Sequence, residues 1–158
     1  ARGPLVMIGY HDMDVETTEA LSADWLHTGD VGRFDEDGFL YIVDRTKDMV
    51  ITGGFNVFPR EVEDVISSHA AVNTVIVVGV PDEKWGEAVK AVVVLSRGFA
   101  PSNELTAEIQ ALVKQIKGSQ QSPKTIDYVD GVPLTAVGKP DKKAVRARYW
   151  SGTDRSVG

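Results

Sequence analysis

The sequence predicts an α+β fold in which a small mixed or antiparallel sheet is flanked by helices. Two apolar runs rich in β-branched residues, 74–80 and 88–95, have the composition of strands. The link between them is too short for a crossover helix, so we expect an antiparallel pair. Stretches with helical spacing lie before and after this pair, which favours an α+β sandwich over a doubly wound sheet.

The first third of the chain is expected to be rich in β-structure. Residues 15–22 predict a short helix. An acidic turn that ends in Gly38 lies between two apolar runs, which predicts a hairpin joining residues 31–34 to residues 39–43. A charged connector follows, and a short apolar strand then leads to the glycine pair at residues 53–54, which indicates unusual backbone.

Two of the predicted helices flank the strand pair, one before it and one after it in the sequence. Pro59 suits the first position of one helix, and the acidic residues after it lie where the helix dipole favours anions. The other helix begins at a cap, Ser102 or Asn103, and ends at Gly118. The apolar positions at helical spacing are Val62, Val65 and Ile66 in the first helix and Leu105, Ile109, Leu112, Val113 and Ile116 in the second.

The last predicted elements are a strand at residues 124–130 and a closing helix at residues 141–149. The predicted order after residue 48 is therefore β-α-β-β-α-β-α. The polar stretch 118–123 is expected to be a loop between the second helix and the last strand.

Composition argues against several classes of protein. The chain has 158 residues, 42% of them hydrophobic and 25% charged, which is ordinary for a globular protein. Its net charge of −6 argues against binding to nucleic acid, although residues 139–155 are locally basic. Cysteine is absent and the three histidines are far apart in sequence, so we expect no disulfide and no metal site. No apolar run has membrane-spanning length and no signal-peptide pattern is present, which indicates a cytoplasmic protein without a transmembrane segment.

Lys139 lies between a glycine and a proline, an arrangement that first suggests a phosphate-binding loop. In the P-loop pattern four residues separate the first glycine from the Gly-Lys pair, and a Ser or Thr follows to hold magnesium. Here six residues separate Gly131 from Gly138, and Pro140 follows the lysine. The spacing excludes a P-loop, and Lys139 needs another explanation.

Four stretches form a series along the chain: "RGPLVMIGYHD", "DWLHTGDVGRFDEDGFLYIVDRTKDMVITGGFNVFPREVEDVI", "VVGVPDEKWGEAVKAVVV" and "PLTAVGKPDKK". Together they resemble the C-terminal part of the acyl-CoA synthetases, in the adenylate-forming (AMP-binding) superfamily. Members of this family activate a carboxylic acid with ATP to an acyl-adenylate and then transfer the acyl group to CoA. Their C-terminal domain swings between the two steps to present a different face to the active site.

The resemblance implies a domain organisation. Residues 1–46 would be the β-rich tail of a large N-terminal domain, residues 47–150 the mobile lid domain and residues 151–158 a flexible tail. The chain begins in mid-pattern without an initiator methionine, which predicts a fragment. The family's phosphate loop and most of its acyl pocket lie in the large N-terminal domain, so the resemblance implies that the fragment is inactive by itself. The implied partners are the large domain and a fatty or aryl carboxylic acid. ATP and CoA are the implied substrates, and Mg²⁺ is expected with ATP on ligands outside this chain.

Three residues match family positions near the nucleotide and the hinge. Asp30 resembles the aspartate that accepts hydrogen bonds from the ribose hydroxyls of ATP, which suits a carboxylate because it is an acceptor only. Arg45 resembles the arginine that approaches the ribose and phosphates, where a fork-shaped cation bridges oxygens. A turn residue and a solvated linker cation are the plainer alternatives. Lys47 matches the hinge, where backbone torsions change.

Four further residues match positions used in the two chemical steps. Gly53 and Gly54 resemble the loop that lines the pantetheine tunnel, where a missing Cβ allows close approach, and a tight turn is a compatible alternative. Trp85 matches a position where some members stack the CoA adenine, with core packing as the alternative. Lys139 matches the catalytic lysine that contacts the substrate carboxylate and the α-phosphate, and an ordinary surface lysine is the alternative.

One departure from the family and two other classes of function are open at this point. In some CoA ligases an aromatic and a basic residue before the "PK" pair hold the CoA nucleotide, whereas "GSQQSPK" offers Gln120, Gln121 and Ser122, with Lys117 or Lys124 as substitute cations. An adenylation domain that loads a carrier-protein thiol is the main enzymatic alternative. A non-catalytic module that binds a nucleotide or a partner through its basic C-terminus is the other.

Overall fold

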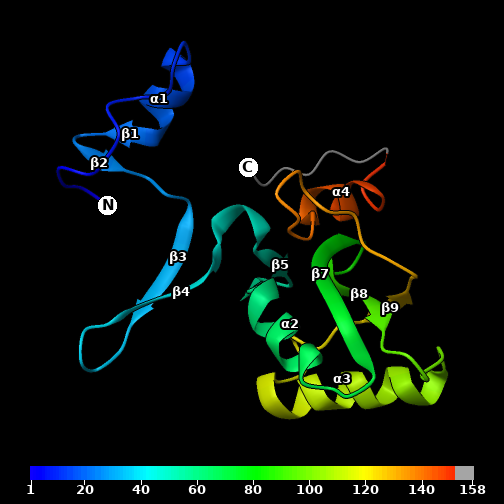
Figure 1. The fold of residues 1–158 in the computed structure, drawn as a ribbon. Coiled ribbons are helices and arrows are strands. Elements are labelled where there is room, and N and C mark those ends of the chain that lie inside the picture. The colour runs from blue at the N-terminus through cyan, green and yellow to red at the C-terminus, as the bar shows by residue number, and fades with distance from the viewer. Residues whose placement is uncertain (152–158) are drawn as a thin grey trace. The chain divides into compact units, whose positions relative to one another are not determined.

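The computed structural model describes residues 1–151 and divides the chain into two compact units (Figure 1). The first unit is Ala1–Thr46, and the second begins at Lys47. The tail predicted at residues 151–158 lies outside the described residues except for Ser151. The assignment of the two units to a large domain and a lid stays a prediction.

The first unit consists of one helix and two small antiparallel ribbons. The acidic turn of the second ribbon is ordered by Asp35, whose carboxylate accepts hydrogen bonds from the backbone N–H groups of Asp37 and Phe39 at 3.1 and 2.8 Å. Gly38 takes the left-handed φ of +84° that the turn needs. The predicted hairpin is therefore confirmed, and the helix predicted at residues 15–22 is present but ends at Ala20, where β1 follows. The elements are α1 (Asp14–Ala20), β1 (Leu21–Ser22) with β2 (Trp25–Leu26), and β3 (Asp30–Phe34) with β4 (Leu40–Arg45).

The second unit is a five-stranded mixed sheet with helices on both faces. The strand order is β6-β5-β8-β7, and β9 pairs in parallel with β8. The predicted antiparallel pair is confirmed as β7 and β8. The elements are the 3-10 turn η1 (Thr46–Asp48), β5 (Val50–Thr52), β6 (Phe55–Val57), α2 (Pro59–Ser67), β7 (Val72–Asp82), β8 (Gly86–Leu95), α3 (Asn103–Lys117), β9 (Thr125–Tyr128) and α4 (Lys142–Ala147).

Both faces of the β7–β8 pair are buried, which explains why its sequence is almost continuously apolar. Successive side chains of a strand point to opposite faces. Val75 and Val77 of β7 pack in the core formed with α2 and α3, whereas Ile76 and Val78 pack in a second core with Val145 of α4. The sheet is therefore a middle layer, with α2 and α3 on one face and α4 on the other.

The predicted helix boundaries hold at α2 and α3 and fail at α4. Pro59 is the first residue of α2, and the side chain of Ser102 caps α3 by accepting a hydrogen bond from the backbone N–H of Leu105 at 3.1 Å. The closing helix is shorter than the predicted 141–149, because Asp141 lies outside it as its N-terminal cap and the helix ends at Ala147, with Arg148 as its C-terminal cap. Strand β6 was not predicted. In the part of the chain that the structure describes, every helix falls short of the length and apolarity that crossing a membrane requires.

Candidate functional site

The first cluster of predicted site residues lies where β3 begins and β4 ends. The strand register pairs Asp30 with Arg45. Nε of Arg45 lies 3.2 Å from Oδ1 of Asp30, and its Nη2 donates to the backbone oxygen of Thr28 at 2.9 Å. Both side chains are partly exposed, so the carboxylate keeps acceptor capacity and the guanidinium keeps donors that face solvent. The two predicted nucleotide-contacting residues are therefore neighbours.

The segment before Asp30 is held in place by backbone contacts. Gly29 has a left-handed φ of +72°, and its backbone oxygen accepts a hydrogen bond from the N–H of Thr46 at 2.8 Å. The N–H of Asp30 donates to the hydroxyl of Thr28 at 3.1 Å. These contacts close the open end of the ribbon and fix the direction in which Asp30 points.

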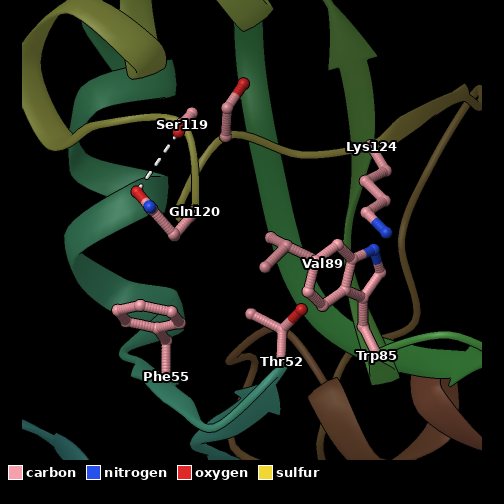
Figure 2. Close-up of a pocket in the computed structure, with 8 residues that line it drawn as sticks. Thr52, Phe55, Trp85, Val89, Ser119, Gln120 and Lys124 are labelled. Atoms are coloured by element: carbon pink, nitrogen blue, oxygen red, sulfur yellow. Dashed lines mark hydrogen bonds between the residues drawn. The ribbon is translucent and has the colours of Figure 1, made fainter.

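The second cluster surrounds a pocket of about 240 Å³ in the second unit. Figure 2 shows Phe55 and Gln120 on one side of it, Trp85 and Lys124 on the other, and Thr52 between them at the base. The lining is mainly apolar, with a few polar groups at the loop between α3 and β9. The complete lining is Thr52, Phe55, Trp85, Val89, Ser119, Gln120, Ser122 and Lys124.

Trp85 and Gly53 are in direct contact at this pocket. The N–H of Gly53 donates to the backbone oxygen of Trp85 at 2.9 Å, and a Cβ built on Gly53 would overlap the six-membered part of the indole ring. Gly53 also has a φ of +56°, so the predicted tight turn is present, and the missing Cβ makes room for the indole ring; an approach to a ligand stays a prediction. Trp85 is 40% exposed and lies outside both hydrophobic cores. Part of its side chain therefore lines the pocket.

Two lysines and one carboxylate surround the indole ring. Nζ of Lys84 lies 4.7 Å and Nζ of Lys124 lies 5.1 Å from the ring centroid of Trp85, within cation–π range. Oδ2 of Asp82 lies 3.2 Å from Nζ of Lys124. The hydrogen bond from the backbone N–H of Trp85, together with Lys124, lowers the pKa of Asp82 below its ordinary value. The carboxylate thus holds both the turn and the lysine at the edge of the pocket.

The loop that departs from the family pattern supplies neutral polar groups. The hydroxyl of Ser119 donates to Oε1 of Gln120 at 3.2 Å, and that of Ser122 donates to the backbone oxygen of Gln110 at 3.0 Å. Lys124 lines the pocket, whereas the other substitute cation, Lys117, pairs with Glu61 of α2 at 3.2 Å. Phe55 and Asp82 were not predicted from the sequence. The Asp-x-x-Trp spacing of a side chain that caps a turn would have identified Asp82.

Lys139 is carried on a tight turn whose two ends are joined. Leu134 forms an isolated antiparallel bridge with Pro140. The N–H of Thr135 donates to the backbone oxygen of Lys139 at 2.7 Å, and the N–H of Lys139 donates back to the hydroxyl of Thr135 at 3.1 Å. Gly138 has a φ of +77°, which the turn requires. The side chain of Lys139 is exposed, and its ammonium makes no ion pair or hydrogen bond with any residue in the described range.

The structure brings some of the predicted site residues together and leaves others apart. Asp30 contacts Arg45 in the first unit, and Gly53 contacts Trp85 in the second. Gly54 follows with a φ of +84° and open space around it, and it does not line the pocket. The predicted hinge residue Lys47 is the first residue of the second unit. The pocket lining does not include Lys139, and residues 1–151 contain no group of three or more His, Asp or Glu side chains placed to hold a metal.

Comparison with known proteins places this geometry in a family. A family model described as the AMP-binding enzyme C-terminal domain matches residues 61–139, which is half of the chain. Over 99% of its length the chain is 62% identical to the medium/long-chain-fatty-acid–CoA ligase FadD8 of Mycobacterium tuberculosis, and it spans 28% of that protein. Over 98% of its length it is 38% identical to the fatty acid–[acyl-carrier-protein] ligase ScoC of Streptomyces coeruleorubidus, and it spans 29% of that protein.

A solved structure agrees in fold as well as in sequence. The amide bond synthetase McbA from Marinactinospora thermotolerans superposes with a TM-score of 0.85 and 42% identity, covering 97% of this chain and 30% of that one. The chain thus corresponds to less than a third of the length of each relative. The chain belongs to the family of AMP-binding enzyme C-terminal domains, which are parts of adenylate-forming enzymes.

Proposed function

We propose that the chain is the C-terminal part of an ATP-dependent acyl-CoA ligase, which converts a carboxylic acid to an acyl-adenylate and then to an acyl-CoA. The observation that carries this proposal is Lys139, an exposed lysine without an ion-pair partner among the described residues, on a turn closed by backbone hydrogen bonds. The 62% identity to a fatty-acid–CoA ligase supports a fatty acid as substrate.

In the first step the acid carboxylate attacks the α-phosphate of ATP and pyrophosphate leaves. We assign Asp30 to the ribose hydroxyls and Arg45 to the ribose and phosphate oxygens, because the pair combines acceptors and fixed donors at one end of a ribbon. Lys139 would place its ammonium between the carboxylate and the α-phosphate, where negative charge accumulates in the transition state. We expect Mg²⁺ to accompany ATP and assign none of its ligands to this chain.

In the second step the thiol of CoA attacks the acyl carbonyl and AMP leaves. We assign the pocket beside Trp85 to the CoA nucleotide, because an exposed indole ring at an apolar pocket of about 240 Å³ offers a stacking surface for an adenine base. Gly53 and Gly54 form the adjoining turn, where the pantetheine would approach the backbone. Lys124 is the lining cation nearest to the ring.

The two steps use different parts of the chain, so the second unit has to turn between them. We propose Lys47 as the hinge, because it is the first residue of the second unit. We propose a large N-terminal domain as the partner of the first unit. Phe34, Leu40 and Ile42 lie on one face of the β3–β4 ribbon and are each more than half exposed, which is an apolar surface suited to such a partner.

The assignment of Lys139 is tested by separating the two half-reactions in the longer enzyme. Lys139→Ala should slow acyl-adenylate formation by roughly 10² or more, as expected for losing a group that stabilises transition-state charge. Thioester formation from supplied acyl-adenylate should change by less than about threefold, because Lys139 takes no part in that step. Pyrophosphate release and acyl-CoA formation measure the two steps.

Lys143→Ala is the matched control, because Lys143 is an exposed lysine a few residues along the same segment. It should leave both half-reactions unchanged. Equal loss of both half-reactions in Lys139→Ala would contradict the assigned role.

One comparison favours a second candidate for the acyl acceptor. ScoC is named as a fatty acid–[acyl-carrier-protein] ligase, so a carrier-protein thiol is the alternative to CoA. The non-catalytic module has less support. Two of its basic residues are engaged in ion pairs, Lys142 with Glu63 and Arg146 with Asp48, each at 3.0 Å.

A further inference from the structure

Helix α4 follows the turn of Lys139 directly and depends on side-chain contacts for its position. It has six residues, and a helix this short gains little stability from its own hydrogen bonds. Val145 is its buried apolar residue. Asp141 caps its start by accepting a hydrogen bond from the N–H of Ala144 at 2.9 Å, so the end of the turn moves with the helix. Contacts that hold α4 in place therefore also hold the backbone of the turn that carries Lys139.

Three polar contacts fasten α4 and the residues after it to the body of the second unit. They reach α2, β9 and β7, and each joins a side chain to an element of the sheet or to a helix packed on it. The contacts are the ion pair of Lys142 with Glu63 at 3.0 Å, the hydrogen bond from Tyr149 to Asp127 at 2.6 Å and the hydrogen bond from Trp150 to the backbone oxygen of Gly79 at 2.9 Å.

A fourth contact reaches the boundary between the two units instead. Nη2 of Arg146 lies 3.0 Å from Oδ1 of Asp48, and the two side chains are 14% and 16% exposed. Asp48 is the last residue of η1 and follows Lys47 directly. Nε of Arg146 is buried without a partner among the described residues. A desolvated guanidinium with an unsatisfied N–H is costly, so stability alone does not account for this residue.

The backbone leads from the boundary directly into the sheet through β5, whereas Arg146 of α4 lies 98 residues after Asp48 in the sequence. After η1 the chain enters β5, which pairs with the edge strand β6 and meets β8 at one register position, Thr52 with Gly86. The ion pair thus connects η1, at the boundary between the units, directly to α4, the helix that follows Lys139. A change of backbone at Lys47 that moves Asp48 would carry Arg146 and α4 with it.

We propose that Asp48 and Arg146 form a positioning pair that fixes the orientation of Lys139 relative to the hinge during acyl-adenylate formation. The pair acts through Lys139 and touches no substrate. This inference rests on the proposed function, because it assumes that Lys139 takes part in the first half-reaction and that the second unit turns at Lys47.

The test measures both half-reactions of the longer enzyme in Arg146→Met, in the isosteric Asp48→Asn and in the double variant. Each single variant should lower kcat for acyl-adenylate formation about tenfold, with KM for ATP changed less than about threefold. Thioester formation from supplied acyl-adenylate should stay within about threefold of the parent enzyme. The double variant should be no slower than either single variant, because both remove the same interaction.

Lys142→Met is the matched control, since it removes an ion pair of similar burial from the same helix, with side chains 20% and 16% exposed. It loosens α4 but leaves the contact to Asp48 in place, so it should slow acyl-adenylate formation much less than Arg146→Met does. Exchange of the charges, Asp48→Arg with Arg146→Asp, should restore part of the lost rate. The inference is overturned if Lys142→Met gives the same loss, if the single effects add in the double variant, or if both half-reactions fall equally.

Lys139→Ala in the same assay separates this inference from the proposed function. If Lys139→Ala leaves acyl-adenylate formation intact, the proposed function fails and the positioning role fails with it. If Lys139→Ala abolishes that step while Arg146→Met does not slow it, the positioning role alone fails.

Discussion

At the level of single residues, the two adjacent glycines at the pocket differ in what they require. Gly53 has a left-handed φ of +56°, and a Cβ there would overlap the ring of Trp85. Gly54 has a φ of +84°, but a Cβ there would meet open space. Gly54 thus needs only the conformational freedom of glycine, whereas Gly53 also needs the absence of a side chain.

We therefore predict that Gly53→Ala is more harmful than Gly54→Ala. Gly54→Ala should cost about 1–2 kcal/mol of unfolding free energy, the usual cost of a side chain in the left-handed region. Gly53→Ala should cost more and should also raise KM for CoA in the longer enzyme, because the ring of Trp85 has to move. Urea denaturation of the chain and steady-state kinetics measure the two effects. Equal results for the two variants would contradict this account.

The roles of single residues at the pocket could be predicted only in part. The sequence identified Trp85 and Gly53 but not that they touch, because the contact depends on the turns of two separate hairpins. The turn-capping role of Asp82 is visible in its spacing to Trp85, but its ion pair with Lys124 is not, because α3 separates the two residues in the sequence. Local spacing indicates a turn, but it does not indicate which distant lysine lies beside it.

At the level of elements, the attachment of α4 to β9 depends on a small charged network. The carboxylate of Asp127 lies between Nζ of Lys90 at 2.7 Å and the hydroxyl of Tyr149 at 2.6 Å. Burial raises the pKa of Asp127, but the hydrogen bonds from Lys90 and Tyr149 outweigh it and the net pKa is lowered. Burial and the contact with Asp127 raise the pKa of Tyr149 to about 12. The network thus favours a charged Asp127 and a neutral Tyr149.

This arrangement predicts a specific loss of stability in alkali. The pKa of Tyr149 is raised from 10.0 to about 12 in the folded chain, so folding favours the protonated phenol. The stabilisation is complete below the unfolded pKa of 10.0 and is lost as pH rises towards 12. Tyr149→Phe should therefore be less stable than the parent at neutral pH, and the difference should shrink across that range. Urea denaturation at several pH values measures it.

Tyr10→Phe is the control for this prediction, because Tyr10 is exposed in the first unit. It should leave the slope of stability against pH unchanged. A difference between Tyr149→Phe and the parent that stays constant in alkali would show that the phenol proton contributes nothing.

At the level of the whole molecule, the order of elements could be predicted because it depends on local patterns. Apolar spacing and caps predicted α2, α3 and the β7–β8 pair. Strand β6 was missed because its three residues, Phe55–Val57, are too few to show a period. The parallel pairing of β9 with β8 depends on α3 crossing the sheet, which no short window of sequence contains. The pairing of strands that are distant in sequence could therefore be seen only in the structure.

The acceptor of the acyl group is likewise a property of the whole enzyme. We expect the longer enzyme to transfer the acyl group to CoA faster than to a carrier protein bearing a phosphopantetheine thiol, because the pocket beside Trp85 suits a nucleotide that the carrier lacks. Competition between equal concentrations of the two thiols measures the preference. Trp85→Ala should weaken transfer to CoA and leave transfer to the carrier unchanged. Preference for the carrier would favour the alternative function.

The boundary between Thr46 and Lys47 has a consequence for how strongly the two units need to bind each other. A single peptide bond joins them, so the second unit stays at a high effective concentration near the first after any contact is released. If the second unit turns at Lys47 as proposed, weak contacts would be sufficient to populate each orientation, and a large apolar interface would instead trap one of them. An enzyme whose two half-reactions need different orientations of its units would turn over faster if the units bind each other weakly.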